Sequence, residues 1–226
     1  MNVEIKGGNF PVAVCQMDAG SAITCESGAM SWMQGGVRME TNTGGGLGKM
    51  LGRAFSGESL FMNKYVADSA GLLAMAAKSP GEIKKVTVTP DKPLIVQKGS
   101  FLAMDPTVQL DIFFQKKIGS GFFGGEGFIM NKLSGSGDVL IEIDGGAVEY
   151  ELGAGDQMTL DTGHLVMMDS TCSMDIVMVK GVGNILFGGE GLFNTVVKGP
   201  GKIVVQTQPL VQFVSTIAEM MNVTKK

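Results

Sequence analysis

FGGEGFIMNK, residues 123–132, decides the fold of this chain because related versions of it occur at two other places. The first version is FSGESLFMNK at 55–64 and the third is FGGEGLF at 187–193. An upstream motif that ends in methionine precedes each version: SGAMSWM at 27–33, KGSFLAM at 98–104 and TGHLVMM at 162–168. The glycine of the upstream motif and the glutamate of the downstream motif lie 30, 27 and 27 residues apart. This order and spacing predict three diverged copies of one unit.

Each copy has the pattern of short β-strands joined by turns. The upstream motif is an apolar strand, and Asp105-Pro106 or Asp169-Ser170 marks a turn after it in copies two and three. A second strand follows at 108–113, where apolar and polar residues alternate. The corresponding run at 174–179 is more continuously apolar, which predicts burial on both faces. The other expected strands cover 72–75, 86–88, 94–96, 139–143 and 203–205.

These patterns predict a mostly β fold in a single domain of residues 1–226, with repeats at about 20–77, 93–144 and 156–207. One unit alone would leave its apolar face open, so we expect the three to pack with pseudo-threefold symmetry as a β-sandwich. Stacking of two units against one is the alternative. The many turns of such a fold explain the 34 glycines.

Two segments have helical periodicity. The clearer one is a C-terminal helix over 209–221, which begins with a proline and carries an apolar stripe: Leu210, Phe213, Val214, Ile217, Met220 and Met221. The other stripe consists of Leu47, Met50, Leu51, Ala54 and Phe55, with Lys49 and Arg53 on the opposite side. We expect both helices to pack on the β core. Contact with a partner or a membrane surface through Leu47, Met50, Leu51 and Phe55 is the alternative.

The composition restricts the partners. Only 18% of the residues are charged, against about 25% in typical soluble domains, so we expect the chain to hide apolar surface in a homo-oligomer. The net charge of −4 argues against a nucleic-acid partner. Cys15, Cys25 and Cys172 include no CxxC pair and predict buried, reduced thiols. With no visible signal sequence and no long apolar run, the expected location is the cytoplasm.

No motif of enzymatic chemistry withstands inspection. GSGFFG at 119–124 matches GxGxxG, but no helix is indicated after it. GGGLGKM at 44–50 lacks the first glycine and the final Ser or Thr of a P-loop. His164 is the only histidine, so we expect it to be structural, and a zinc site of several histidines cannot form within one chain. We therefore expect no enzyme and no cofactor.

The three glutamates of the downstream motifs, Glu58, Glu126 and Glu190, are the candidate ligand-binding residues. On a pseudo-threefold axis they would form a carboxylate ring that could hold Ca²⁺ or Mg²⁺ or share a proton. Away from the axis each carboxylate would cap its own glycine-rich turn. The sequence leaves both arrangements open.

The region from Gly35 to Lys64, with TGGGLGKMLGRAFSGESLFMNK at 43–64 and the later FGGEGF and FGGEGLF copies, resembles a known family. These are the bacterial and archaeal relatives of the mitochondrial biogenesis protein called altered inheritance of mitochondria, number twenty-four. The resemblance extends from Val3 to about Val214. It implies a β fold of the trp RNA-binding attenuation protein-like (TRAP-like) superfamily, related to the double-stranded β-helix. It implies no established enzyme activity and assigns no functional residues here.

The sequence therefore favours a non-enzymatic scaffold or interaction protein that associates with itself, with a protein partner or a membrane surface as a further contact. A small-ligand or metal-binding module at a pseudo-threefold axis is the alternative function.

Overall fold

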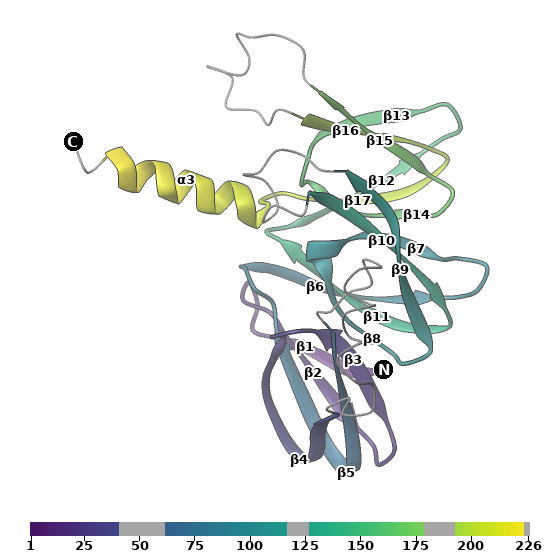
Figure 1. The fold of residues 1–226 in the computed structure, drawn as a ribbon, viewed down its shortest axis with the longest axis vertical. Helices are drawn as coiled ribbons and strands as arrows, with labels where there is room; N and C mark the ends of the chain where they lie inside the picture. Colours follow the sequence, from purple (N-terminus) through teal and green to yellow (C-terminus); the bar gives the residue numbers. More distant parts are fainter. Residues whose placement is uncertain (41–61, 117–126, 179–192, 224–226) are drawn as a thin grey trace, which may run out of the picture. The chain divides into compact units, whose positions relative to one another are not determined.

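The structure is a computed structural model, and it describes residues 1–40, 62–116, 127–178 and 193–223. These residues lie mostly in β-strands and include one α-helix near the end of the chain, which confirms the predicted fold class (Figure 1). The chain divides into two compact units. Unit 1 comprises Met1–Pro93, Gly99–Ile112 and Lys132–Ile143, and unit 2 comprises Leu94–Lys98, Phe113–Asn131 and Asp144–Lys226. The single-domain organisation of the chain stays a prediction.

Unit 1 is built on an eight-stranded sheet with the order β1-β2-β5-β3-β8-β11-β6, in which β4 pairs with β5 off this path. Its strands are β1 (Asn2–Lys6), β2 (Val12–Met17), β3 (Ala22–Glu26), β4 (Met30–Glu40), β5 (Met62–Ala76), β6 (Gly81–Val88), β8 (Phe101–Met104) and β11 (Gly137–Asp144). The core of this unit is formed by buried apolar side chains, among them Ala13, Cys15, Ile23, Leu73, Leu102 and Leu140.

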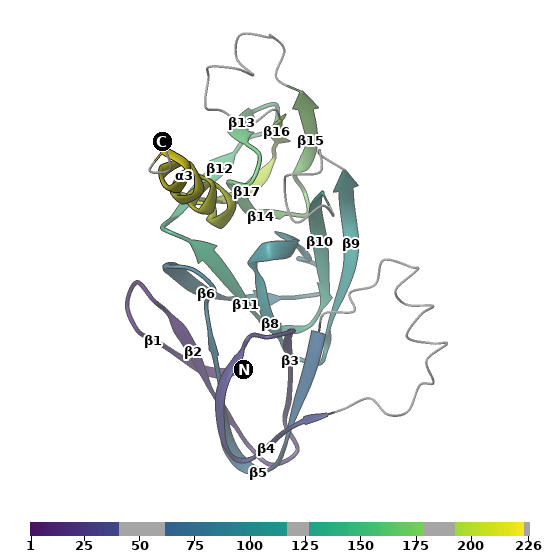
Figure 2. The same cartoon turned by 60° about the vertical axis from the view of Figure 1, so that its left-hand side comes forward.

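Unit 2 contains a three-stranded sheet with the order β13-β16-β15 and most of a six-stranded sheet with the order β12-β17-β14-β7-β10-β9 (Figure 2). The residues 108–112 of β9 and 132–135 of β10 belong to unit 1. The strands are β7 (Leu94–Gln97), β9 (Val108–Lys116), β10 (Phe128–Gly135), β12 (Ala147–Leu152), β13 (Gln157–Asp161), β14 (Leu165–Asp169), β15 (Ser173–Met178), β16 (Phe193–Lys198) and β17 (Gly201–Gln206). A 3-10 turn (Lys98–Ser100) precedes β8, and helix α3 (Leu210–Val223) follows β17. The core includes Ile95, Phe128, Met130, Leu165, Met168 and Ile203.

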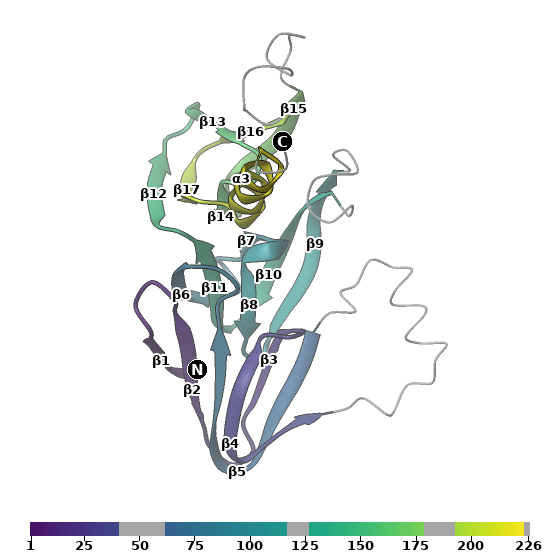
Figure 3. The ribbon, with the colours of Figure 1, turned by 90° about the vertical axis from the view of Figure 1, so that its left-hand side faces the viewer.

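A similar strand pairing occurs in each predicted copy together with the strand before its predicted bounds, which is β2, β6 or β12. In copy three, β13 and β15 pair with β16, while β12 and β14 pair with β17. In copy two, β7 and β9 pair with β10, while β6 and β8 pair with β11. In copy one, the 15-residue strand β5 takes the place of both, and β2, β3 and β4 all pair with it (Figure 3). The pseudo-threefold arrangement of the copies, however, is not confirmed.

Glycines let copy one keep a continuous strand where the other copies turn. The position in β4 that corresponds to the Asp105-Pro106 turn of copy two forms a bulge instead of a turn. The register with β5 shifts there, between Gly35 and Val37. Gly35 has a φ of +78°, and a Cβ on it would lie 2.6 Å from the carbonyl oxygen of Ala70. Because β4 and β5 approach so closely here, a side chain at Gly35 would clash with backbone atoms that cannot move aside.

Most of the expected strands are confirmed, including 72–75 within β5, 86–88 within β6 and 139–143 within β11. The expected burial of both faces at 174–179 is wrong, because only Ile176 of β15 is buried and Met178 is 65% exposed. β15 ends the three-stranded sheet, so none of the described strands pairs with its outer edge. The three cysteines are free and buried, as expected. The predicted helix around Leu47–Phe55 lies outside the described residues.

The C-terminal helix is confirmed, but the expectation that its apolar stripe packs on the β core is wrong. Phe213, Val214 and Ile217 are 41%, 54% and 42% exposed, and Met220 and Met221 are about two-thirds exposed at 66% and 65%. The helix is held to the strands by polar contacts at its first turn. Its periodicity correctly indicated a helix without indicating what the apolar face contacts.

Candidate interaction surface

Successive copies are joined by one kind of strand pairing. The first strand of copy one, β3, pairs antiparallel with the upstream-motif strand of copy two, β8. The first strand of copy two, β7, pairs in the same way with the upstream-motif strand of copy three, β14. Each joint lies inside one compact unit. The chain therefore contains two examples of a single copy-to-copy contact.

Among the described strands, one upstream-motif strand and one first strand have no partner in a copy-to-copy pairing. The upstream-motif strand of copy one is the Met30–Gln34 part of β4, which pairs only with β5 (Figure 3). The first strand of copy three is β13, which ends its sheet and pairs only with β16 (Figure 2). We call these the β4 edge (Met30–Gln34) and the β13 edge (Gln157–Leu160).

Burial follows the pairing at equivalent positions. Trp32 and Met33 of the β4 edge are 50% and 42% exposed. The residues at the same places of the paired strands are at most 8% exposed: Ala103 and Met104 in β8, Met167 and Met168 in β14. The β4 edge thus presents large apolar side chains at positions that a neighbouring strand covers in the other two copies.

The two edges are uncharged segments of strands that carry charge farther along, at Arg38 and Glu40 in β4 and at Asp161 in β13. Exposed strand edges are usually protected from pairing by charged side chains. The other marginal strands carry such residues: Glu4 and Lys6 in β1, Glu82, Lys84 and Lys85 in β6, Asp111 and Lys116 in β9, Glu149 and Glu151 in β12, and Asp175 in β15. The β4 edge and the β13 edge contain no charged residue. Their composition therefore permits pairing with another strand.

The described hydrogen bonds between helix α3 and the strands and loops of unit 2 lie in the first turn of the helix. Leu210 donates its backbone N–H to Asp144 Oδ2 at 2.7 Å, and the Gln212 amide donates to Asp161 Oδ2 at 2.6 Å. His164 contacts both β17 and the helix. Its Nδ1 lies 2.7 Å from the carbonyl oxygen of Gln206 in β17, and its Nε2 lies 3.2 Å from Gln212 Oε1 in α3. Both ring nitrogens contact the protein, which supports the expected structural role of His164.

A buried charge cluster stabilises unit 1. Glu142 in β11 is 4% exposed, and its Oε1 lies 3.1 Å from the Lys78 ammonium. Glu142 Oε2 accepts the backbone N–H of Lys78 at 3.1 Å, and Glu26 forms a second ion pair with the same ammonium. Burial raises the pKa of the Glu142 carboxyl, and the Lys78 charge opposes that rise. Glu26 lies in β3 and Glu142 in β11, so the cluster connects two strands of one sheet through Lys78.

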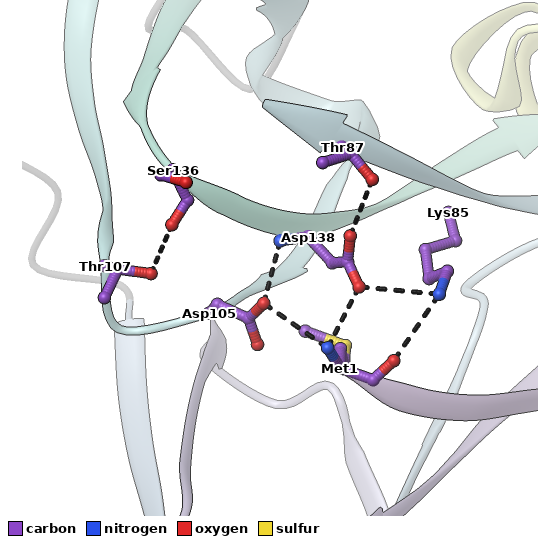
Figure 4. A network of polar contacts seen from close by, with 7 residues as sticks. All are labelled: Met1, Lys85, Thr87, Asp105, Thr107, Ser136 and Asp138. Carbon is purple, nitrogen blue, oxygen red and sulfur yellow. Dashed lines mark hydrogen bonds and ion pairs between the residues drawn. The ribbon is translucent and has the colours of Figure 1, made fainter. Parts of the chain in front are cut away.

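A second polar network surrounds the amino group of Met1 (Figure 4). This ammonium lies 2.9 Å from Asp138 Oδ2 and 3.5 Å from Asp105 Oδ2. Thr87 donates to the other oxygen of Asp138, and Lys85 lies 3.4 Å from this carboxylate. The hydrogen bond to Asp138 raises the pKa of the amino group. Burial by itself would raise the pKa of Asp138, but the bonds to Met1 and Thr87 lower it overall. The network therefore links Met1, which precedes β1, to Asp105 after the end of β8 and to Asp138 near the start of β11.

The predicted site residues are not tested by the described part of the structure. Glu58, Glu126 and Glu190 lie outside the described residues, as do Leu47, Met50, Leu51 and Phe55, so both sets stay predictions. Within the described ranges, no group of three or more His, Cys, Asp or Glu side chains could hold a metal ion. The two bare edges were missed by reasoning from motifs. The usable signal in the sequence was the absence of charge from the segments 30–34 and 157–160.

Comparison with known proteins finds similarity over nearly the whole chain. The family model described as mitochondrial biogenesis AIM24 matches residues 3–208. The chain belongs to the AIM24 family. A relative from Streptococcus pyogenes serotype M6, described as an uncharacterized protein, is 32% identical over 217 residues, covering 92% of this chain and 86% of the relative.

A crystal structure of another Streptococcus pyogenes protein has the same fold as this AIM24 family member. It superposes with a TM-score of 0.82 at 27% identity and covers 97% of this chain and 99% of that one. The expected kinship with the TRAP-like superfamily is not confirmed by these relatives. No helix among the described residues is long and apolar enough to cross a membrane.

Proposed function

We propose that this AIM24 family chain is a non-enzymatic scaffold that associates with itself through exposed apolar β surface. The observation that carries the proposal is the exposure of Trp32 and Met33, at 50% and 42%, where the equivalent residues of the other copies are buried. Large apolar side chains grouped on an edge strand are typical of surfaces that another chain covers. The low content of charged residues, 18%, supports the same function.

Sedimentation velocity over a range of protein concentrations tests this function. We expect the average mass to rise with concentration through the micromolar range, since association is a mass-action equilibrium. A single species of monomer mass at all these concentrations would overturn the proposal.

Helix α3 favours a second contact, with a protein partner. Its exposed stripe includes Val214 and Ile217, yet Leu210–Val223 contains no lysine or arginine. Helices that lie on membranes usually carry basic residues on their polar face, so a protein surface suits α3 better than a lipid surface. Flotation with neutral and anionic vesicles tests this choice: the protein should stay with the unbound fraction, and co-flotation with either vesicle type would contradict it. The location in the cytoplasm remains a prediction from sequence.

A further inference from the structure

We propose that the β13 edge of one chain pairs antiparallel with the β4 edge of a second copy, so that chains associate head to tail. This inference rests on the self-association proposed above and names its two surfaces. It starts from the repeated joint between copies, in which the first strand of one copy pairs with the upstream-motif strand of the next. Copy three has the first strand without a following copy, and copy one has the upstream strand without a preceding one. One further chain supplies the missing neighbour of the β13 edge, and another supplies that of the β4 edge.

The register of the two internal joints is identical when it is counted from the glycine of each upstream motif. At the first joint, Thr24, four residues before Gly28, pairs with Met104, five residues after Gly99. At the second joint, Ile95, four residues before Gly99, pairs with Met168, five residues after Gly163. The next pairs agree as well, Cys25 with Ala103 and Val96 with Met167. Two joints of unlike sequence therefore share one geometry.

The same rule fixes the contact between chains. Thr159 lies four residues before Gly163, and Met33 lies five residues after Gly28, so these two residues pair. Leu160 then pairs with Trp32, and Met158 pairs with Gln34, as Leu94 does with Asp169 at the second internal joint. The side chain of Met33, now 42% exposed, would enter an environment like that of Met104 and Met168, which are 6% and 1% exposed.

The chemistry of both edges fits a second copy of the chain. Neither edge carries a charge, and β4 presents apolar side chains to a strand whose Met158 and Leu160 already pack against the core of unit 2. The two surfaces differ, so the contact is heterologous: each chain uses its β13 edge toward one neighbour and its β4 edge toward another. Backbone hydrogen bonds supply the pairing, and the apolar side chains of the two edges supply burial.

Thiol cross-linking between two different single-cysteine variants tests this register. Full-length Met33→Cys and Thr159→Cys chains are mixed and treated with a short bifunctional thiol reagent. Directly opposed residues have Cβ atoms about 5 Å apart, so we expect a covalent dimer that contains one chain of each kind. The native cysteines are buried and burial raises the pKa of Cys15 and Cys25 to about 12, so the unsubstituted chain should give no dimer.

Matched controls separate this contact from others. Trp32→Cys mixed with Thr159→Cys should lose the dimer, because a shift of one residue turns the side chain to the other face of the strand. Each single variant alone should also give none, because a heterologous joint does not place a residue opposite itself. A chain carrying both cysteines should form the cross-link between chains, with its yield falling on dilution.

The outcomes distinguish the inference from the proposed function. Chains that associate by sedimentation but give no Met33–Thr159 cross-link would overturn the register and leave self-association standing. A cross-link within one doubly substituted chain, independent of dilution, would also overturn the inference. A protein that is monomeric throughout the micromolar range would overturn both.

Discussion

At the scale of single residues, the ion pair of Glu142 and Lys78 gives the clearest stability prediction. Glu142 is 4% exposed, and Lys78 Nζ lies 3.1 Å from its Oε1. Lys78→Met leaves this carboxylate buried without its partner, which we expect to cost about 2–3 kcal/mol of unfolding free energy at pH 7, below the full cost of a buried pair because Lys78 is partly exposed. Urea unfolding at one fixed protein concentration measures the loss.

The pH dependence of the Lys78→Met variant follows from the pKa of Glu142. Burial raises this pKa in the folded chain above its ordinary value, so the folded state binds the proton more tightly than the unfolded state. The unfolding free energy of the variant should therefore rise as the pH falls from 7 toward the ordinary glutamate pKa. The double variant Lys78→Met, Glu142→Gln is the control, and it should lack this rise. Equal pH profiles for the two variants would contradict the assignment.

The close approach of β4 and β5 gives a second residue-scale prediction. Gly35→Ala forces a Cβ to 2.6 Å from the Ala70 carbonyl oxygen at a φ of +78°, whereas Gly20 has a φ of +84° and open space around it. We expect Gly20→Ala to cost about 1–2 kcal/mol for its backbone conformation alone. Gly35→Ala should cost about 3 kcal/mol or more, because the clash with backbone adds to the same conformational cost. Similar urea midpoints for both variants would show that the strands can separate without penalty.

At the scale of elements, helix α3 depends on its first turn. Gln212 donates to Asp161 at 2.6 Å and contacts His164, while the stripe farther along the helix is exposed. Gln212→Ala should therefore speed amide hydrogen exchange over Leu210–Val223 by several-fold and leave β14 and β17 unchanged. Ser215→Ala is the matched control, since Ser215 bonds only to Val211 of its own helix in the contacts described. Faster exchange spreading into β17 would show instead that the helix supports the sheet.

Sequence reasoning located elements better than it located their environments. Alternation and turn residues correctly indicated β9, β11 and β17, because period and turn chemistry are local properties. Burial of β15 and of the α3 stripe was predicted wrongly, because apolar residues indicate a surface to be covered without identifying the cover. The chemistry of the motif glutamates Glu58, Glu126 and Glu190 indicated a candidate ligand site. The feature on which the proposed contact rests is instead the absence of charge from the segments 30–34 and 157–160. That feature has meaning only once the strand pairing is known.

At the scale of the whole molecule, the repeated strand pairing accounts for the self-association that we propose. A chain that joins copy to copy by one strand pairing has an unused strand of each kind left over, and further chains can use both. Native sheets usually guard such edges with charge, so two uncharged edges of complementary type support the proposed contact.

The uncharged edges predict that association depends little on salt. Attraction between charged surfaces weakens as ionic strength rises, whereas apolar burial and backbone hydrogen bonds persist. Between about 50 and 500 mM sodium chloride, where the Debye length falls from roughly 14 to 4 Å, we expect the dissociation constant to change by less than about twofold. Equilibrium sedimentation measures it, and a tenfold weakening would indicate that charged surfaces join the chains instead.

Sedimentation velocity of two blocked variants tests the head-to-tail contact most directly. Met33→Lys puts a charge in the β4 edge and Thr159→Lys puts one in the β13 edge, and both positions are exposed in the single chain. A lysine at a position equivalent to buried Met168 or Ile95 would have to lose its hydration without a partner. Met39→Lys and Met178→Lys, on exposed residues outside both edges, serve as controls that should associate like the unsubstituted chain.

Each blocked variant keeps one intact edge. We predict that each alone sediments as a monomer at concentrations where the unsubstituted chain associates, and that an equal mixture forms a dimer from the β13 edge of Met33→Lys and the β4 edge of Thr159→Lys. A mixture that stays monomeric, or single variants that associate as the unsubstituted chain does, would contradict the head-to-tail contact.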